Sequence, residues 1–208
     1  MHYRAVGNRC AADLVSFVLP VSVEQALGIL AGENINLIEV DIISLAKSLV
    51  GKAGWLWAAR EWQAPSFFDC SSFTKWLYGE MGIWIPRRPQ QQFEFCREFG
   101  SLHSLDQVAV GDILFLNSPY RKGVRSETEE GIGHVCVVSG EDSAICATNS
   151  EFGRGVVELP MSGLLSSRKL VGVGRIAHPA GRIMTFVFPS EREVETSDDI
   201  RWIVLQNC

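Results

Sequence analysis

The feature that most constrains this fold is a change of pattern near residue 113. From there to residue 176 the chain has five short apolar runs separated by Gly, Asp, Glu and Ser, at residues 113–116, 134–139, 144–148, 156–159 and 170–176. Short apolar runs bounded by such turn residues predict strands, and strands that follow one another closely favour antiparallel pairing. We therefore predict an antiparallel sheet in the second half of the chain.

The first half has helical periodicity instead. Apolar residues recur at helical spacing over residues 22–30, 39–50 and 71–81, and a short helix is also predicted over residues 90–99. Glycines follow the second and third of these segments, as is typical of helix ends. Helices first and strands second is the α+β arrangement, with N-terminal helices packed on a central antiparallel sheet.

We divide the chain into a partly helical N-terminal extension (1–38), a main domain (39–176) and a C-terminal extension (177–208). The last segment has a β-like run at 183–188 and an apolar run at 200–205, both candidate strands. The segment is expected to form either an added hairpin or a partner-binding arm. Residues 117–133, between the first two strands of the main domain, are rich in charge. They are expected to form a surface loop or a lid over a cleft.

Composition excludes several functional classes. The net charge of −5 argues against bulk attraction to nucleic acid or to an anionic membrane. No apolar run approaches the roughly 18 residues of a membrane helix. Asp13 interrupts the N-terminal apolar run, so we identify no signal peptide. We expect a soluble cytoplasmic protein with a small-molecule or protein partner; the sequence does not indicate an oligomeric state.

The six cysteines are far apart, at positions 10, 70, 96, 136, 146 and 208. None forms a C-x-x-C motif or a Cys/His pair at zinc-ligand spacing, so we expect neither a metal ion nor another cofactor. Thiols in a chain without a signal peptide are expected to stay reduced, which disfavours disulfides. Core packing or chemistry remains for Cys70, which lies in the stretch FFDCSSF.

Cys70 precedes the predicted helix 71–81, with Asp69 as the expected N-cap. The positive end of a helix stabilises a thiolate, and a core cysteine has no need of that position. A cysteine nucleophile also needs a base, commonly histidine. Of the four histidines, only His134 begins a predicted buried strand. Cys70 and His134 are therefore the candidate catalytic pair.

Five segments, in order along the chain, resemble motifs of the NlpC/P60 cysteine peptidases, papain-like enzymes that cut cell-wall peptides. They are AKSLVG (46–51), FDCSSF (68–73), IPRRPQQQ (85–92), VGDILF (110–115) and GHVCVV (133–138). The resemblance implies a papain-like domain with Cys70 as nucleophile and His134 as base. It also implies that Asp69 and Ser71 help to bind the free amino end of a peptide stem.

Two positions depart from the family pattern. Trp55 stands where the family has a tyrosine that assists at the oxyanion, and only its indole N–H is a possible donor. The third polar position, which orients the histidine, falls on Cys146 when counted without a gap. A thiol orients imidazole poorly, so Asn149 is the better chemical candidate, and Thr148 is a further alternative.

The resemblance implies that a murein-derived peptide is cleaved between D-glutamate and a diamino acid, through a thioester on Cys70. The expected partner is a small peptide or muropeptide inside the cell. One rival is an amidase or acyltransferase on the same scaffold. The cluster of Trp55, Trp57 and Trp62 would then hold an apolar acyl group, although the same three residues are equally suited to a packed core. The other rival is a binding module with a decayed site.

Overall fold

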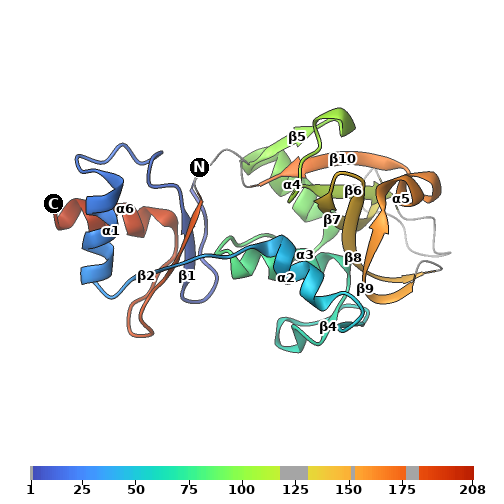
Figure 1. The fold of residues 1–208 in the computed structure, drawn as a ribbon, viewed down its shortest axis with the longest axis horizontal. Helices are drawn as coiled ribbons and strands as arrows, with labels where there is room; N and C mark the ends of the chain where they lie inside the picture. Colours follow the sequence, from blue (N-terminus) through green and yellow to red (C-terminus); the bar gives the residue numbers. More distant parts are fainter. Residues whose placement is uncertain (1, 118–130, 151–152, 177–182) are drawn as a thin grey trace. The chain divides into compact units, whose positions relative to one another are not determined.

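The computed structural model describes residues 2–117, 131–150, 153–176 and 183–208, in two compact units (Figure 1). The first unit consists of residues 1–42, 78–84 and 179–208, and the second of residues 43–77 and 85–178. The central residues of the predicted lid or surface loop, 118–130, lie outside the described residues. Among the described helices, none has the length and apolar character needed to span a membrane.

A six-stranded antiparallel sheet forms the centre of the second unit, in the order β5-β10-β6-β7-β8-β9 (Figure 1). The strands are β5 (Ser101–His103), β6 (Ile113–Asn117), β7 (Ile132–Gly140), β8 (Ser143–Ser150), β9 (Gly153–Pro160) and β10 (Leu170–Arg175). The five predicted strands and their antiparallel pairing are confirmed. The edge strand β5 was not predicted, because three residues carry too little periodicity.

The helices and short elements accompanying this sheet are α2 (Ile42–Leu49), β3 (Gly54–Trp55), β4 (Phe67–Phe68), α3 (Cys70–Glu80), α4 (Pro89–Phe99) and α5 (Met161–Ser167). Two 3-10 turns lie at Glu61–Gln63 and Leu105–Gln107. The predicted helices at 39–50, 71–81 and 90–99 are confirmed within a few residues, whereas α5 was not predicted. The predicted α+β fold, with helices and a central antiparallel sheet, is thereby confirmed.

Helix α4 packs directly on the sheet. The ring centroid of Phe93 on α4 lies 5.2 Å from that of Phe115 on β6, edge to face. A Cβ added at Gly174 on β10 would lie 2.6 Å from Phe115 and 2.7 Å from the sulfur of Cys96. Only a glycine therefore lets α4 approach the sheet this closely.

The VGD segment ahead of β6 has a structural role. Asp112 is 1% exposed and receives two hydrogen bonds from Arg175 of β10, from Nε and from Nη2, both at 2.7 Å. It also accepts the backbone N–H of Ala109 at 2.8 Å. The forked ion pair joins the start of β6 to the end of its neighbour β10.

The first unit contains a three-stranded antiparallel sheet in the order β1-β11-β2. Its elements are β1 (Arg9–Ala12), α1 (Val23–Gly32), β2 (Asn36–Ile38), β11 (Met184–Val187) and α6 (Ser197–Gln206). The sequence indicates two separate terminal extensions. In the structure, strands β1 and β2 from the first extension both pair with strand β11 from the last. The predicted run at 183–188 is strand β11.

The prediction of a strand at 200–205 is wrong, because this run is part of helix α6. Thr196 caps the helix by accepting the backbone N–H of Asp198 at 3.2 Å, and Asp199 accepts the N–H of Thr196 at 2.9 Å. Ile200 and Val204, one helical turn apart, are both fully buried. The capping box and this spacing outweigh the strand propensity of the apolar run.

Candidate active site

Asp69 caps α3 as predicted. Its Oδ1 accepts the backbone N–H of Ser72 at 2.8 Å, while Ser72 Oγ accepts the backbone N–H of Asp69 at 2.9 Å. Cys70 is the first residue of the helix and is partly exposed. The first four N–H groups of a helix have no acceptor within it, so the Cys70 thiol lies where the backbone is most electropositive.

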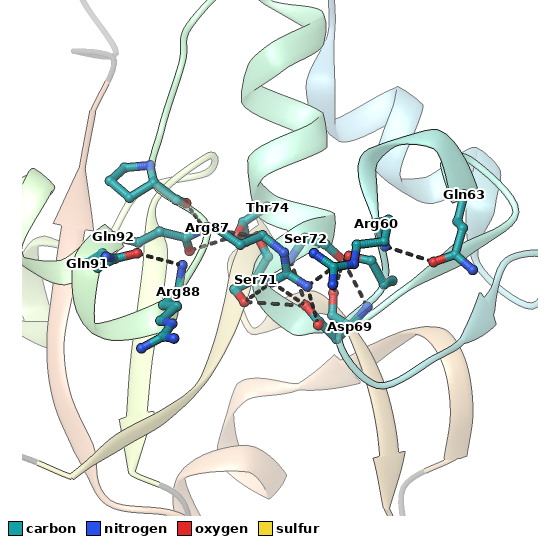
Figure 2. A network of polar contacts seen from close by, with 12 residues as sticks. Arg60, Gln63, Asp69, Ser71, Ser72, Thr74, Arg87, Arg88, Gln91 and Gln92 are labelled. Atoms are coloured by element: carbon teal, nitrogen blue, oxygen red, sulfur yellow. Dashed lines mark hydrogen bonds and ion pairs between the residues drawn. The ribbon is translucent and has the colours of Figure 1, made fainter. Parts of the chain in front are cut away.

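Arg87 holds this helix end in a polar network that Figure 2 shows. Its Nη1 donates to Asp69 Oδ1 at 3.0 Å and to Ser71 Oγ at 2.8 Å, and its Nη2 donates to Asp69 Oδ2 at 2.5 Å. Nη2 also donates to the carbonyl of Ala59 at 2.9 Å. Asp69, 8% exposed, is therefore already engaged by an ion pair and by its cap. Arg87 belongs to the IPRRPQQQ segment, which by itself indicates no role for this arginine.

Gln92 joins α4 to the same turn of α3 (Figure 2). Its buried side chain donates to the carbonyls of Ser71 and Pro86, both at 2.9 Å, and accepts from Thr74 Oγ1 at 2.8 Å. Only one orientation of the buried amide group lets its NH₂ donate both hydrogen bonds and its oxygen accept the third. Gln92 thus fixes the first turn of α3 relative to α4, a role that sequence reasoning missed.

His134 lies on β7 and is 6% exposed. Its imidazole has side-chain hydrogen bonds with the thiols of Cys70 and Cys146. The start of β7 is held by Gln90 of α4, whose Nε2 donates to the carbonyl of Ile132 at 2.6 Å. The structure therefore brings the predicted pair of Cys70 and His134 together.

The residue on the other side of His134 is Cys146, not the preferred candidate Asn149. Strands β7 and β8 pair Val137 with Ile145 and Val138 with Ala144, so the same register places Cys136 opposite Cys146. Side chains alternate between the faces of a sheet, so His134, Cys136 and Cys146 share one face. Asn149, three residues after Cys146, belongs to the opposite face and is exposed. Thr148 is buried on the first face, and its hydroxyl donates to Ser150 Oγ at 3.1 Å.

The charges in this cluster favour an ion pair. Burial alone would lower the pKa of His134, but the hydrogen bond and charge of Cys146, followed by those of Cys70, raise it to about 10. The hydrogen bond from Cys136 does most to lower the pKa of Cys146; with His134 and Arg168 it outweighs burial and brings this pKa to about 5. Burial raises the pKa of Cys136 well above the ordinary thiol value. A Cys146 thiolate beside a His134 imidazolium, with a neutral Cys136, is the arrangement these contacts favour.

The three tryptophans of the predicted cluster differ in exposure: one is half-buried and two are exposed. Trp55 in β3 pairs with Phe68 in the parallel strand β4, two residues before Cys70. It is half-buried, and its ring centroid lies 6.4 Å from that of Trp57. Trp57 and Trp62 are 69% and 81% exposed. The predicted aromatic cluster is therefore not a packed core.

Comparison with known proteins gives one consistent family. The NlpC/P60 family model matches residues 55–175, more than half of the chain. A Listeria innocua protein named "Probable endopeptidase p60" is 29% identical over 135 residues, which cover 65% of this chain and 24% of the other. A Corynebacterium glutamicum protein named "Probable endopeptidase" is 30% identical over 109 residues, covering 52% of this chain and 42% of the other.

A solved structure agrees with these sequence matches. An NlpC/P60 family protein from Bacillus cereus is 27% identical, with a TM-score of 0.51, over 65% of this chain and 39% of that one. The chain spans less than half the length of each of these three proteins. The family match includes Cys70, His134 and Cys146, the residues that the fold assembles. This chain belongs to the NlpC/P60 family.

Proposed function

We propose that this protein is a cysteine peptidase that hydrolyses peptides derived from peptidoglycan. The observation that carries the proposal is the hydrogen bond between Cys70, at the N-terminus of α3, and His134 on β7. A thiol at a helix N-terminus beside an imidazole is the arrangement a cysteine nucleophile requires. Membership of the NlpC/P60 family and the endopeptidase names of the relatives support the same chemistry.

In the proposed reaction, Cys70 releases its proton to solvent and reacts as a thiolate beside the His134 imidazolium, attacking the peptide carbonyl carbon. The imidazolium protonates the leaving amine as the tetrahedral intermediate collapses to a thioester, which leaves His134 neutral. Neutral His134 then deprotonates the water that hydrolyses the thioester, and this step restores the Cys70 thiolate and the imidazolium. The backbone N–H of Cys70 and the indole N–H of Trp55 are the proposed donors to the oxyanion.

Cys146 takes the orienting role in this proposal. A neutral thiol is a weak hydrogen-bond acceptor, but a thiolate carries a full negative charge, as the carboxylate of other catalytic triads does. Because the pKa of Cys146 is lowered to about 5, the thiolate is the form expected near neutral pH. It would stabilise the imidazolium that forms during catalysis.

The finer proposal is cleavage between D-glutamate and a diamino acid, with Asp69 and Ser71 at the free amino end of the peptide. Both oxygens of Asp69 already bind Arg87, so a substrate ammonium would share the carboxylate with the guanidinium. Ser71 Oγ, which contacts both residues, would complete this polar subsite.

The test is incubation of the wild-type protein and Cys70→Ala with a panel of muropeptides, read by mass spectrometry. The wild type should release fragments that correspond to hydrolysis at the proposed bond, and Cys70→Ala should release none. Cys208→Ser, which changes an exposed cysteine in the first unit, is the matched control and should cleave as the wild type does. Intact muropeptides after incubation with the wild type would refute the substrate class.

The exposure of Trp57 and Trp62 favours one second candidate, an acyltransferase or amidase for an apolar acyl group. Two large, mostly exposed indoles in the segment that connects β3 to β4, ahead of Cys70 in the sequence, suit an apolar ligand better than a short peptide. An acyl thioester donor offered with an acceptor amine separates the two: transfer gives the new amide, and hydrolysis gives only the free acid.

A further inference from the structure

Three metal-ligating side chains converge in the core of the second unit. The ring nitrogen of His134 and the sulfurs of Cys136 and Cys146 all lie within 4.8 Å of one another, and all three residues are buried. The cluster is built by the register of β7 and β8, which places the two cysteines opposite each other. The ten-residue spacing of Cys136 and Cys146 matches no zinc motif, which is why the sequence predicted no metal.

The three side chains form a suitable set for a soft metal ion. Zinc prefers sulfur and imidazole ligands such as these, and soft sulfur ligands disfavour Mg²⁺ and Ca²⁺. With Zn–S bonds of about 2.3 Å, the ligand atoms of such a site lie roughly 3.7 Å apart, somewhat closer than the 4.8 Å limit within which these three atoms lie. Water would take the fourth position of a tetrahedral ion, as it does in zinc sites with three protein ligands.

The local charge suits such an ion. Zn²⁺ with two thiolates and a neutral imidazole carries no net charge, so the loaded site buries no uncompensated charge. Arg168 lies close enough for its charge to act on both Cys136 and Cys146. The guanidinium is held by a hydrogen bond from Nη1 to the carbonyl of Asn117 at 3.3 Å. A cation beside the thiols favours the thiolate forms that bind a metal ion.

We propose that His134, Cys136 and Cys146 bind one soft metal ion of the Zn²⁺ class. Binding releases the remaining thiol protons to solvent and leaves the imidazole neutral. If the proposed function holds, the metal-bound state is an inhibited one, because the ion occupies the base, His134, and its orienting residue, Cys146. The binding step does not depend on that function.

The experiment is a titration of the full chain, freed of metal and reduced with a non-chelating phosphine, with Zn²⁺ against a chromophoric chelator. Co²⁺ in place of Zn²⁺ gives a second readout, since thiolate ligands produce sulfur-to-cobalt charge-transfer absorbance. We expect one ion per chain. Cys136→Ser and Cys136→Ala should each weaken binding by roughly 100-fold or more, since changes outside the ligand shell already cost about 10–100-fold.

Cys208→Ser is the matched control and should retain wild-type affinity, because this cysteine is exposed and lies in the other unit. Circular dichroism of each variant establishes that it is folded. The proposal is overturned if the reduced wild type binds no stoichiometric Zn²⁺, or if both Cys136 variants bind as tightly as the wild type. Because these readouts need no substrate, failure of the peptidase proposal would be seen separately, in the muropeptide assay.

Discussion

At the residue scale, the unusual feature is an imidazole held between two thiols. His134 contacts Cys70 on one side and Cys146 on the other, so the orienting group of the proposed triad is itself a cysteine. Asn149 is the better orienting residue only if the Cys146 thiol is neutral. In the fold, a neighbouring thiol and the imidazole stabilise the Cys146 thiolate, which removes the objection.

Cys146→Ser should lower kcat for muropeptide cleavage on the order of 10²-fold, because an alcohol cannot supply the negative charge beside the imidazolium. Steady-state kinetics of the variant, with its fold checked by circular dichroism, measure the effect. Asn149→Ala is the matched control and should leave kcat unchanged, since its side chain is exposed on the opposite face of β8. If Asn149→Ala instead lowered kcat while Cys146→Ser left it unchanged, the orienting residue would be Asn149.

Arg87→Ala should destabilise the protein by about 2 kcal/mol. It leaves the buried carboxylate of Asp69 without its ion-pair partner, and the partial exposure of Arg87 reduces the cost below that of a fully buried pair. Urea denaturation measures the free energy of unfolding. Arg88→Ala, at the exposed neighbouring position, should change it by less than about 0.5 kcal/mol. Equal losses in the two variants would contradict the assigned role of the Asp69 pair.

At the element scale, the site depends on how closely α4 approaches the sheet. Helix α4 provides Gln92 to the first turn of α3 and Gln90 to the start of β7, so it positions both elements that carry the proposed catalytic pair. Its contact with β10 requires a glycine at position 174. The periodicity of residues 90–99 predicted the helix, but not its contacts, because those join residues far apart in sequence.

Gly174→Ala should destabilise the protein by about 1–3 kcal/mol, because the new methyl group would overlap Phe115 and Cys96. Thermal unfolding measures the change. Gly163→Ala in α5 is the matched control: its Cβ would meet nothing within 4 Å, and alanine favours a helix by up to about 1 kcal/mol. A Gly174→Ala protein as stable as the wild type would mean that α4 does not pack this closely.

At the scale of the whole molecule, each unit buries a cysteine outside the candidate site. Cys10 in the first unit and Cys96 in the second are both fully buried, and burial raises the pKa of each thiol to about 12. Above pH 9 the unfolded chain releases these protons while the folded chain keeps them. Their contribution to stability is therefore complete below about pH 9 and is lost as the pH rises to about 12.

Unfolding free energies measured from pH 8 to 11 should therefore fall above pH 9, by about 1 kcal/mol per pH unit for each of these thiols. Cys96→Ala should show a shallower decline than the wild type, whereas Cys208→Ala, at an exposed position, should show the same decline. Parallel curves for the wild type and Cys96→Ala would show that this thiol does not remain protonated in the fold.

The sequence by itself determined the α+β order, the five main strands, the helix capped by Asp69 with Cys70 at its N-terminus, and the candidate pair of Cys70 and His134. These follow from periodicity, capping and helix-end electrostatics, which act over a few residues. Only the tertiary structure decided that Cys146 faces His134, that Arg87 pairs with Asp69, and that the two termini share a sheet. Each depends on strand register or on contacts between distant segments, because a shift of one residue would turn every side chain of a strand to the other face.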